Sequence, residues 1–79
     1  MLFEKAFMDK KKGDRIEVLV TSTEHQLGIK VEYKGNAGII YDSDIRGTYK
    51  YTIDVNDVIP VKIAKIRKDK KDFSCYPLL

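Results

Sequence analysis

The fold is decided by the stretch Leu27-Gly28-Ile29-Lys30-Val31-Glu32-Tyr33-Lys34-Gly35-Asn36-Ala37-Gly38-Ile39-Ile40-Tyr41. Its first half alternates apolar and polar side chains, and this period of two is typical of a half-buried β-strand. Lys34-Gly35-Asn36 predicts a tight turn, because Gly and Asn tolerate a positive φ. Residues 37–41 predict a second, short strand. The stretch therefore predicts two strands joined by a turn.

The same alternation recurs before this stretch and after it. Residues 15–21 place three apolar side chains on one face, namely Ile16, Val18 and Val20. Residues 73–76 predict a last short strand, which ends at a proline. Residues 22–26 are polar and predict a loop that carries His25, the single histidine of the chain.

Residues 58–67 predict a further strand with an irregularity. Ile59, Val61 and Ile63 share one face, whereas Ile66 falls out of phase with them. A bulge near Ala64-Lys65 would restore the phase, as in strongly coiled strands. Pro60 cannot donate a backbone hydrogen bond, so we expect it at an edge or at an unpaired position.

Five short strands in a chain of 79 residues must close on themselves to hide their edges. We therefore predict an all-β fold, a five-stranded Greek-key barrel of the OB type, with an SH3-like barrel as the rival. Residues 12–79 would form this domain. Residues 1–11 would be a lead-in segment that is flexible or holds one helical turn. Residues 42–45 suit a helical turn capped by a side-chain oxygen, and residues 46–55 form a longer connection that carries Tyr49 and Tyr51.

Composition limits the function. The net charge is +3 and the pI about 9.0, a mild basic excess. Cys75 is the only cysteine, which excludes a disulfide framework and a cysteine-based zinc site within the chain, and it suits a small core position. No apolar run approaches the roughly 20 residues that cross a bilayer, so we expect a cytoplasmic monomer without membrane contact. The residues form no catalytic constellation, and we expect neither an enzyme nor a metal or other cofactor.

One sequence pattern occurs twice. Gly13-Asp14 and Asn56-Asp57 each place a turn-forming residue and an aspartate before an alternating apolar strand. Both predict a tight turn that leads into a curved strand of the same barrel.

Five short motifs follow one another in a fixed order: Gly13-Asp14; Gly28-Ile29-Lys30-Val31; Gly38-Ile39-Ile40-Tyr41-Asp42-Ser43; Val55-Asn56-Asp57 with Val61-Lys62-Ile63; and Phe73-Ser74-Cys75. In this order they resemble the ribosomal protein S-one type RNA-binding domain, an OB-fold barrel, over about residues 12–76. Residues 66–72 also resemble the S-one-like repeats of conserved virulence factor B proteins. The resemblance implies an RNA-binding barrel.

The same resemblance implies where RNA would lie. The family places two aromatic residues around the second-strand glycine and a histidine or aromatic residue in the third strand. Those places hold Leu27, Lys30 and Tyr41 in this chain, so that only Tyr41 offers a stacking ring. The basic residue that the family places before its fifth strand corresponds to Lys71.

Basic residues gather late in the chain, between residues 62 and 71. A positive groove holds the phosphates of single-stranded nucleic acid, although lysines can equally keep a hairpin edge solvated. We predict weak, non-specific binding of single-stranded RNA through a basic face with few stacking rings. The candidate binding residues are Lys30, Lys34, Tyr41, Lys65, Arg67 and Lys71. The alternative is a protein-interaction OB module that has lost the stacking surface and binds a protein or ribonucleoprotein partner.

Overall fold

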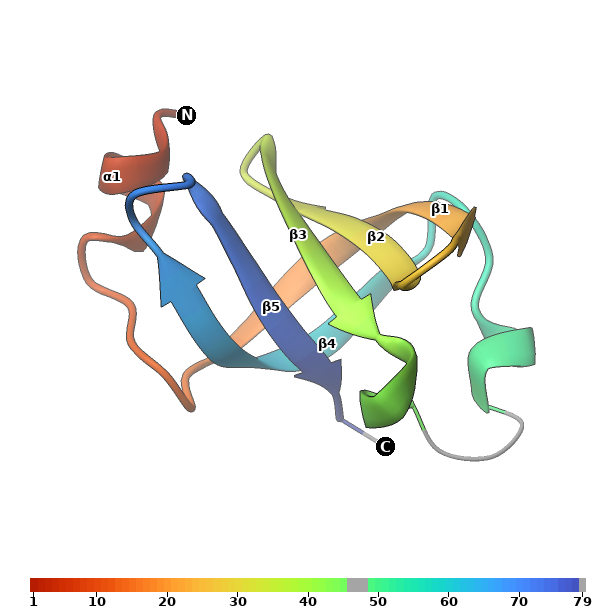
Figure 1. The fold of residues 1–79 in the computed structure, drawn as a ribbon. Coiled ribbons are helices and arrows are strands. Elements are labelled where there is room, and N and C mark those ends of the chain that lie inside the picture. Colours follow the sequence, from red (N-terminus) through yellow and green to blue (C-terminus); the bar gives the residue numbers. More distant parts are fainter. Residues whose placement is uncertain (46–48, 79) are drawn as a thin grey trace.

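The computed structural model describes residues 1–45 and 49–78, and Figure 1 shows their arrangement. Residues 46–48, at the start of the expected connection, and Leu79 lie outside the described residues, as does the ring of Tyr49. The elements are α1 (Phe3–Phe7), β1 (Arg15–His25), β2 (Gly28–Tyr33), β3 (Asn36–Tyr41), the 3-10 turns η1 (Asp42–Asp44) and η2 (Tyr49–Thr52), β4 (Val58–Arg67) and β5 (Asp72–Pro77).

The five strands close into a barrel in the order β1-β2-β3-β5-β4, with β4 pairing back onto β1. Four of the strand pairs are antiparallel, and only β3 and β5 run parallel. This is the Greek-key order of an OB fold rather than an SH3-like barrel. The predicted fold class is therefore confirmed.

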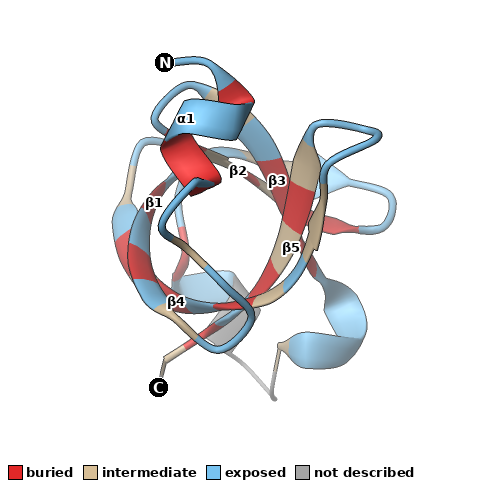
Figure 2. Cartoon of the chain, turned by 90° about the vertical axis from the view of Figure 1, so that its left-hand side faces the viewer, coloured by how far each residue is buried: buried red, intermediate tan, exposed pale blue. Residues whose placement is uncertain are grey.

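The barrel interior is filled by the alternate residues that the sequence pattern placed on one face. Val20, Val61 and Ile63 are among the residues with no exposed surface. Helix α1 adds to this core, because Phe3 and Phe7 are buried and contact it. The Phe7 ring lies with its centroid 5.0 Å from that of Phe73 and 5.3 Å from that of Tyr33. Figure 2 looks into this end of the barrel and shows α1 at its rim.

The predicted bulge in β4 is confirmed. The register with β5 shifts between Ile63 and Lys65, so that Ala64 is the extra residue. The shift turns Ile66 inward, where it packs against the core. Pro60 is unpaired on the β5 side, as expected, because the β4–β5 register begins at Val61 opposite Pro77. On its other side it is opposite Glu17 of β1. Its carbonyl accepts a hydrogen bond from the Leu78 backbone, just beyond the end of β5.

Three local expectations were wrong. Strand β1 continues to His25, which pairs with Gly28, so the expected polar loop is mostly strand. The alternation of residues 27–34 also predicts Leu27 on the buried face with Ile29, Val31 and Tyr33, but Leu27 precedes β2 and is 54% exposed. The N-cap residue of η1 is Tyr41, which makes no side-chain capping hydrogen bond.

Two similar tight turns lead into β1 and into β4. The Asp14 carboxylate accepts from the Lys11 backbone at 3.0 Å, and the Asp57 carboxylate accepts from the Asp54 backbone at 2.9 Å. The residue before each aspartate has a positive φ, 92° at Gly13 and 77° at Asn56. The repeated sequence pattern thus corresponds to a repeated turn.

Candidate nucleic-acid interface

Four strands present one continuous outer face. Residues between the buried positions of each strand point outward, and the strand register aligns them in rows. In one row Lys30 of β2 is opposite Ile39 of β3, and Ile39 is opposite Ser74 of β5. Ser74 is in turn opposite Lys65 of β4. Ile39 is only 9% exposed although it is not part of the interior cluster. It is therefore a nearly buried apolar residue of the outer face, with Lys30 and Lys65 in the same row.

The next row lies toward the far ends of β3 and β5. Gly28 is opposite Tyr41, and Lys62 is opposite Tyr76. Each tyrosine is 37% exposed. A Cβ at Gly28 would lie 2.0 Å from the Ile40 carbonyl oxygen, so only glycine permits this close approach of the strands. No side chain from β2 therefore stands directly beside Tyr41.

The third row lies on the other side of the first row, toward the β4–β5 turn, and holds an ion pair. Arg67 at the end of β4 is opposite Asp72 at the start of β5. The Arg67 Nε donates to Asp72 Oδ1 at 2.6 Å, and Nη2 donates to Oδ2. The hydrogen bond that Arg67 donates to Asp72 is the main cause that raises the pKa of Arg67.

The ion pair interacts electrostatically with the row beside it. The hydrogen bond from Arg67 holds the pKa of Asp72 below its ordinary value, and the positive charge of Lys30 acts in the same direction. The strand register thus brings Lys30, Tyr41 and Lys65 to neighbouring rows of one face, and Arg67 lies in the row beyond Lys30 and Lys65, toward the β4–β5 turn.

The other two candidates lie at the opposite end of the face, next to α1. Lys34 and Gly35 form the β2–β3 turn, both with positive φ, and the Lys34 ammonium lies 5.3 Å from the centre of the Tyr33 ring. Lys71 also has a positive φ, in the β4–β5 turn, and lines a small pocket with Glu4 and Asn36. The length of β3, about 20 Å at 3.3 Å per residue, separates Lys34 from Tyr41.

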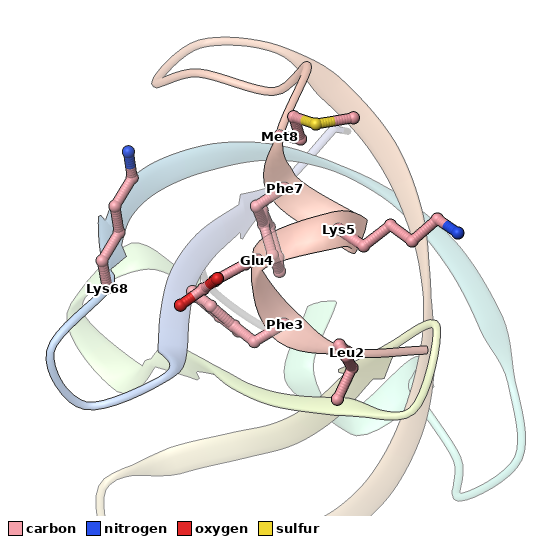
Figure 3. A pocket seen from close by; sticks show the side chains of 7 residues that line it. All are labelled: Leu2, Phe3, Glu4, Lys5, Phe7, Met8 and Lys68. Carbon is pink, nitrogen blue, oxygen red and sulfur yellow. The ribbon is translucent and has the colours of Figure 1, made fainter.

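Beside α1 there is an open, mainly apolar pocket of 620 Å³, shown in Figure 3. Its apolar wall includes the exposed side chains of Leu2 and Met8, and Glu4 and Lys68 stand at its border. Most of its lining residues belong to α1 and its flanks, and Tyr41, Lys30 and Lys65 are not among them.

The described residues offer little for covalent or metal chemistry. Burial raises the pKa of the Cys75 thiol to about 12, which leaves it protonated and unreactive, and its core position is confirmed. The His25 Nδ1 accepts a hydrogen bond from the Leu27 backbone. Within residues 1–45 and 49–78, no three His, Cys, Asp or Glu side chains gather to hold a metal ion. In the same part of the chain, no helix has the length and apolarity needed to cross a membrane.

Comparison with known proteins supports the fold. Neither a model of a protein family nor a curated protein sequence matches this chain. An uncharacterized protein of Methanocaldococcus jannaschii has a similar structure, with a TM-score of 0.75 and 19% identity over 90% of this chain and 96% of that one.

Two further solved structures carry functional descriptions. A chain of the a/eIF2alpha–aDim2p–rRNA complex from Pyrococcus horikoshii gives a TM-score of 0.70 at 16% identity, over 85% of this chain and 44% of that one. A multidomain protein with nucleic acid binding domains from Streptococcus pneumoniae gives 0.69 at 11% identity, over 89% of this chain and 24% of that one. The chain thus spans less than half the length of these two neighbours.

Sequence reasoning missed Tyr76 as a residue of the outer face, and it placed Lys62 among the late basic residues but not among the binding candidates. Both alternate with buried neighbours, so the period of two could have placed them outside the barrel. Their position beside Tyr41, however, depends on the parallel pairing of β3 with β5, which links segments far apart in the sequence.

Proposed function

We propose that this chain binds single-stranded RNA, weakly and without sequence preference, across the outer face of β2, β3, β5 and β4. The observation that carries the proposal is the grouping of Tyr41, Lys30 and Lys65 on one face of a closed barrel. Lysines attract phosphates and release counterions, and an exposed ring offers a stacking surface to a base of any sequence.

Two features favour weak binding. On β2 the positions beside Tyr41 hold Gly28 and Lys30, so that strand offers no ring to a second base. Arg67 is engaged by Asp72, which sets a negative charge within the binding face. A longer strand would gain further phosphate contacts from Lys34 and Lys71 at the α1 end.

The similar solved structures give independent support. One lies in a complex with rRNA, and another has nucleic acid binding domains. The order of sequence motifs supports the narrower assignment to S-one type domains, with the conserved virulence factor B repeats as the relatives it suggests.

The test is a salt titration of a fluorescently labelled oligouridylate of about ten nucleotides, followed by fluorescence anisotropy. We expect binding at low salt whose logarithmic slope against salt is about 0.7 per phosphate contact. A Lys65→Ala variant should lower that slope by about one contact without changing base preference. Equal affinity for a duplex of the same length, or binding insensitive to salt, would contradict the proposal.

One observation favours the alternative of a protein-interaction module. Leu2 and Met8 are each 80% exposed beside the α1 pocket, and exposed apolar side chains that gather in a patch mark protein contacts. If the chain is such a module, a substitution of Leu2 should abolish binding of the protein partner. RNA binding should either be absent from the start or be unaffected by the substitution. The salt titration separates the two functions.

A further inference from the structure

We propose that Tyr41 of β3 and Tyr76 of β5 form a two-ring platform that stacks two successive unpaired bases of one nucleic-acid strand. The inference rests on the proposed function and deepens it. It assigns the second stacking position to β5, where Tyr76 and Lys62 lie, and not to β2.

The two tyrosines occupy corresponding positions on β3 and β5, each two residues beyond the paired residues Ile39 and Ser74. Gly38 is opposite Phe73, and Ile39 is opposite Ser74, in the parallel pairing of β3 with β5. Two steps further along both strands this alignment reaches Tyr41 and Tyr76. Neighbouring strands lie about 4.8 Å apart where they pair, as at Ile39 and Ser74, and Figure 1 shows β3 and β5 running in the same direction from that pair toward their ends.

Both rings point away from the core. The residues just before them, Ile40 and Cys75, have no exposed surface and belong to the interior cluster. Because side chains alternate along a strand, Tyr41 and Tyr76 must face outward. Each keeps 37% of its surface exposed. Aromatic surface that stays accessible in this way is available for contact with bases.

The surroundings suit a strand of nucleic acid. Gly28 stands on the β2 side of Tyr41 and cannot be replaced by a larger residue, so no side chain blocks that flank. Lys62 stands opposite Tyr76 on the β4 side. The next row lies about 6.6 Å away, which is two residues along the strand. It holds Lys30 on one side of Ile39 and Lys65 on the other. Bases on the rings would thus have ammonium groups nearby for their phosphates.

The experiment compares three probes of about ten nucleotides: oligouridylate, oligothymidylate and an abasic oligonucleotide, which keeps the phosphates but has no bases. Tyr76→Ala should weaken binding of oligouridylate by roughly 5- to 140-fold, from about 1–3 kcal/mol per stacked base at 1.4 kcal/mol per factor of ten. The loss should be the same for oligothymidylate, because stacking uses the base and not the sugar. Binding of the abasic probe should not change.

Two variants serve as controls. Tyr76→Phe keeps the ring and should bind like the unaltered protein. Tyr51 on η2 is 83% exposed and lies outside the face, so Tyr51→Ala should have no effect. If Tyr76→Ala does not fold, NMR on the unaltered protein replaces this comparison. The ring-proton shifts of Tyr76 should change on addition of oligouridylate and should not change with the abasic probe.

The outcomes separate the two proposals. If Tyr41→Ala weakens binding and Tyr76→Ala does not, the two-ring platform is wrong while the proposed function stands. A Tyr76→Ala loss that is equal for the abasic probe, or confined to one of the two sugars, would also overturn the platform. If the unaltered protein binds no probe at low salt, both proposals fail together.

Discussion

Arg67 and Asp72 form a two-pronged ion pair across the end of the β4–β5 hairpin, on the same outer face as Tyr41. Each side chain is about one third exposed, 37% for Arg67 and 31% for Asp72. Both partners therefore remain within reach of solvent and of a ligand. The arginine that sequence reasoning assigned to phosphate binding thus already has a carboxylate partner before any ligand arrives.

This pairing predicts that Asp72→Asn strengthens RNA binding. The substitution removes a negative charge from the face and frees the Arg67 guanidinium for a phosphate. We expect a higher affinity for oligouridylate at low salt and a steeper dependence on salt, measured by anisotropy.

The matched control is Asp69→Asn, which removes the same charge from the neighbouring exposed turn and leaves the hydrogen bonds between Arg67 and Asp72 intact. If the two variants behave alike, only net charge matters and the pairing has no special effect.

The same ion pair predicts a dependence of stability on pH. Because the pKa of Asp72 is lowered in the folded protein, its ionised form stabilises the fold above the ordinary value of 3.8. This contribution should fade as the pH falls below 3.8 through the lowered pKa. The difference in melting temperature between the unaltered protein and Asp72→Asn should therefore be constant near neutral pH and vanish in acid. A difference that grows in acid would contradict the assignment.

Helix α1 predicts a large loss of stability for Phe7→Ala. The ring is 4% exposed and contacts Phe3, Tyr33 and Phe73. Removing a buried phenylalanine costs about 3–5 kcal/mol, which urea unfolding can measure. Met8→Ala, at an 80% exposed position of the same segment, should change stability by less than about 0.5 kcal/mol. Equal effects of the two variants would show that α1 does not belong to the core in solution.

The position of Lys34 and Lys71 predicts an effect that depends on ligand length. Lys34 lies at the other end of β3 from Tyr41, about 20 Å away, and Lys71 lies in the β4–β5 turn, where it lines a pocket with Asn36 at the start of β3. Lys34→Ala and Lys71→Ala should weaken binding of an oligouridylate of about ten nucleotides and leave a trinucleotide unaffected, whereas Lys65→Ala should weaken both. An equal effect on the trinucleotide would show that these lysines belong to the same binding site as Tyr41 and Lys65.

Much of the fold could be predicted because the buried face of each strand leaves a local signature. The alternation of residues 58–67 located β4, and the phase error at Ile66 located its bulge at Ala64. The turns before Asp14 and Asp57 could also be predicted, since the combination of a positive-φ residue and a carboxylate acts within a few residues.

Other features depend on partners far along the chain. Ser22, Thr23 and Glu24 have polar side chains, yet β1 continues through them because its backbone pairs with β2. Phe3 and Phe7 reach the core because the barrel leaves space at one end for two rings, which no local pattern reveals.

The central claim is that Tyr41 and the lysines around it bind single-stranded RNA. The most direct measurement is the affinity of the unaltered protein and of Tyr41→Ala for an oligouridylate at low salt, with thermal unfolding of both proteins measured alongside. The account predicts that the variant keeps its melting temperature and binds more weakly by about 1–3 kcal/mol. Absence of binding by the unaltered protein, or unchanged affinity in a folded Tyr41→Ala variant, would contradict it.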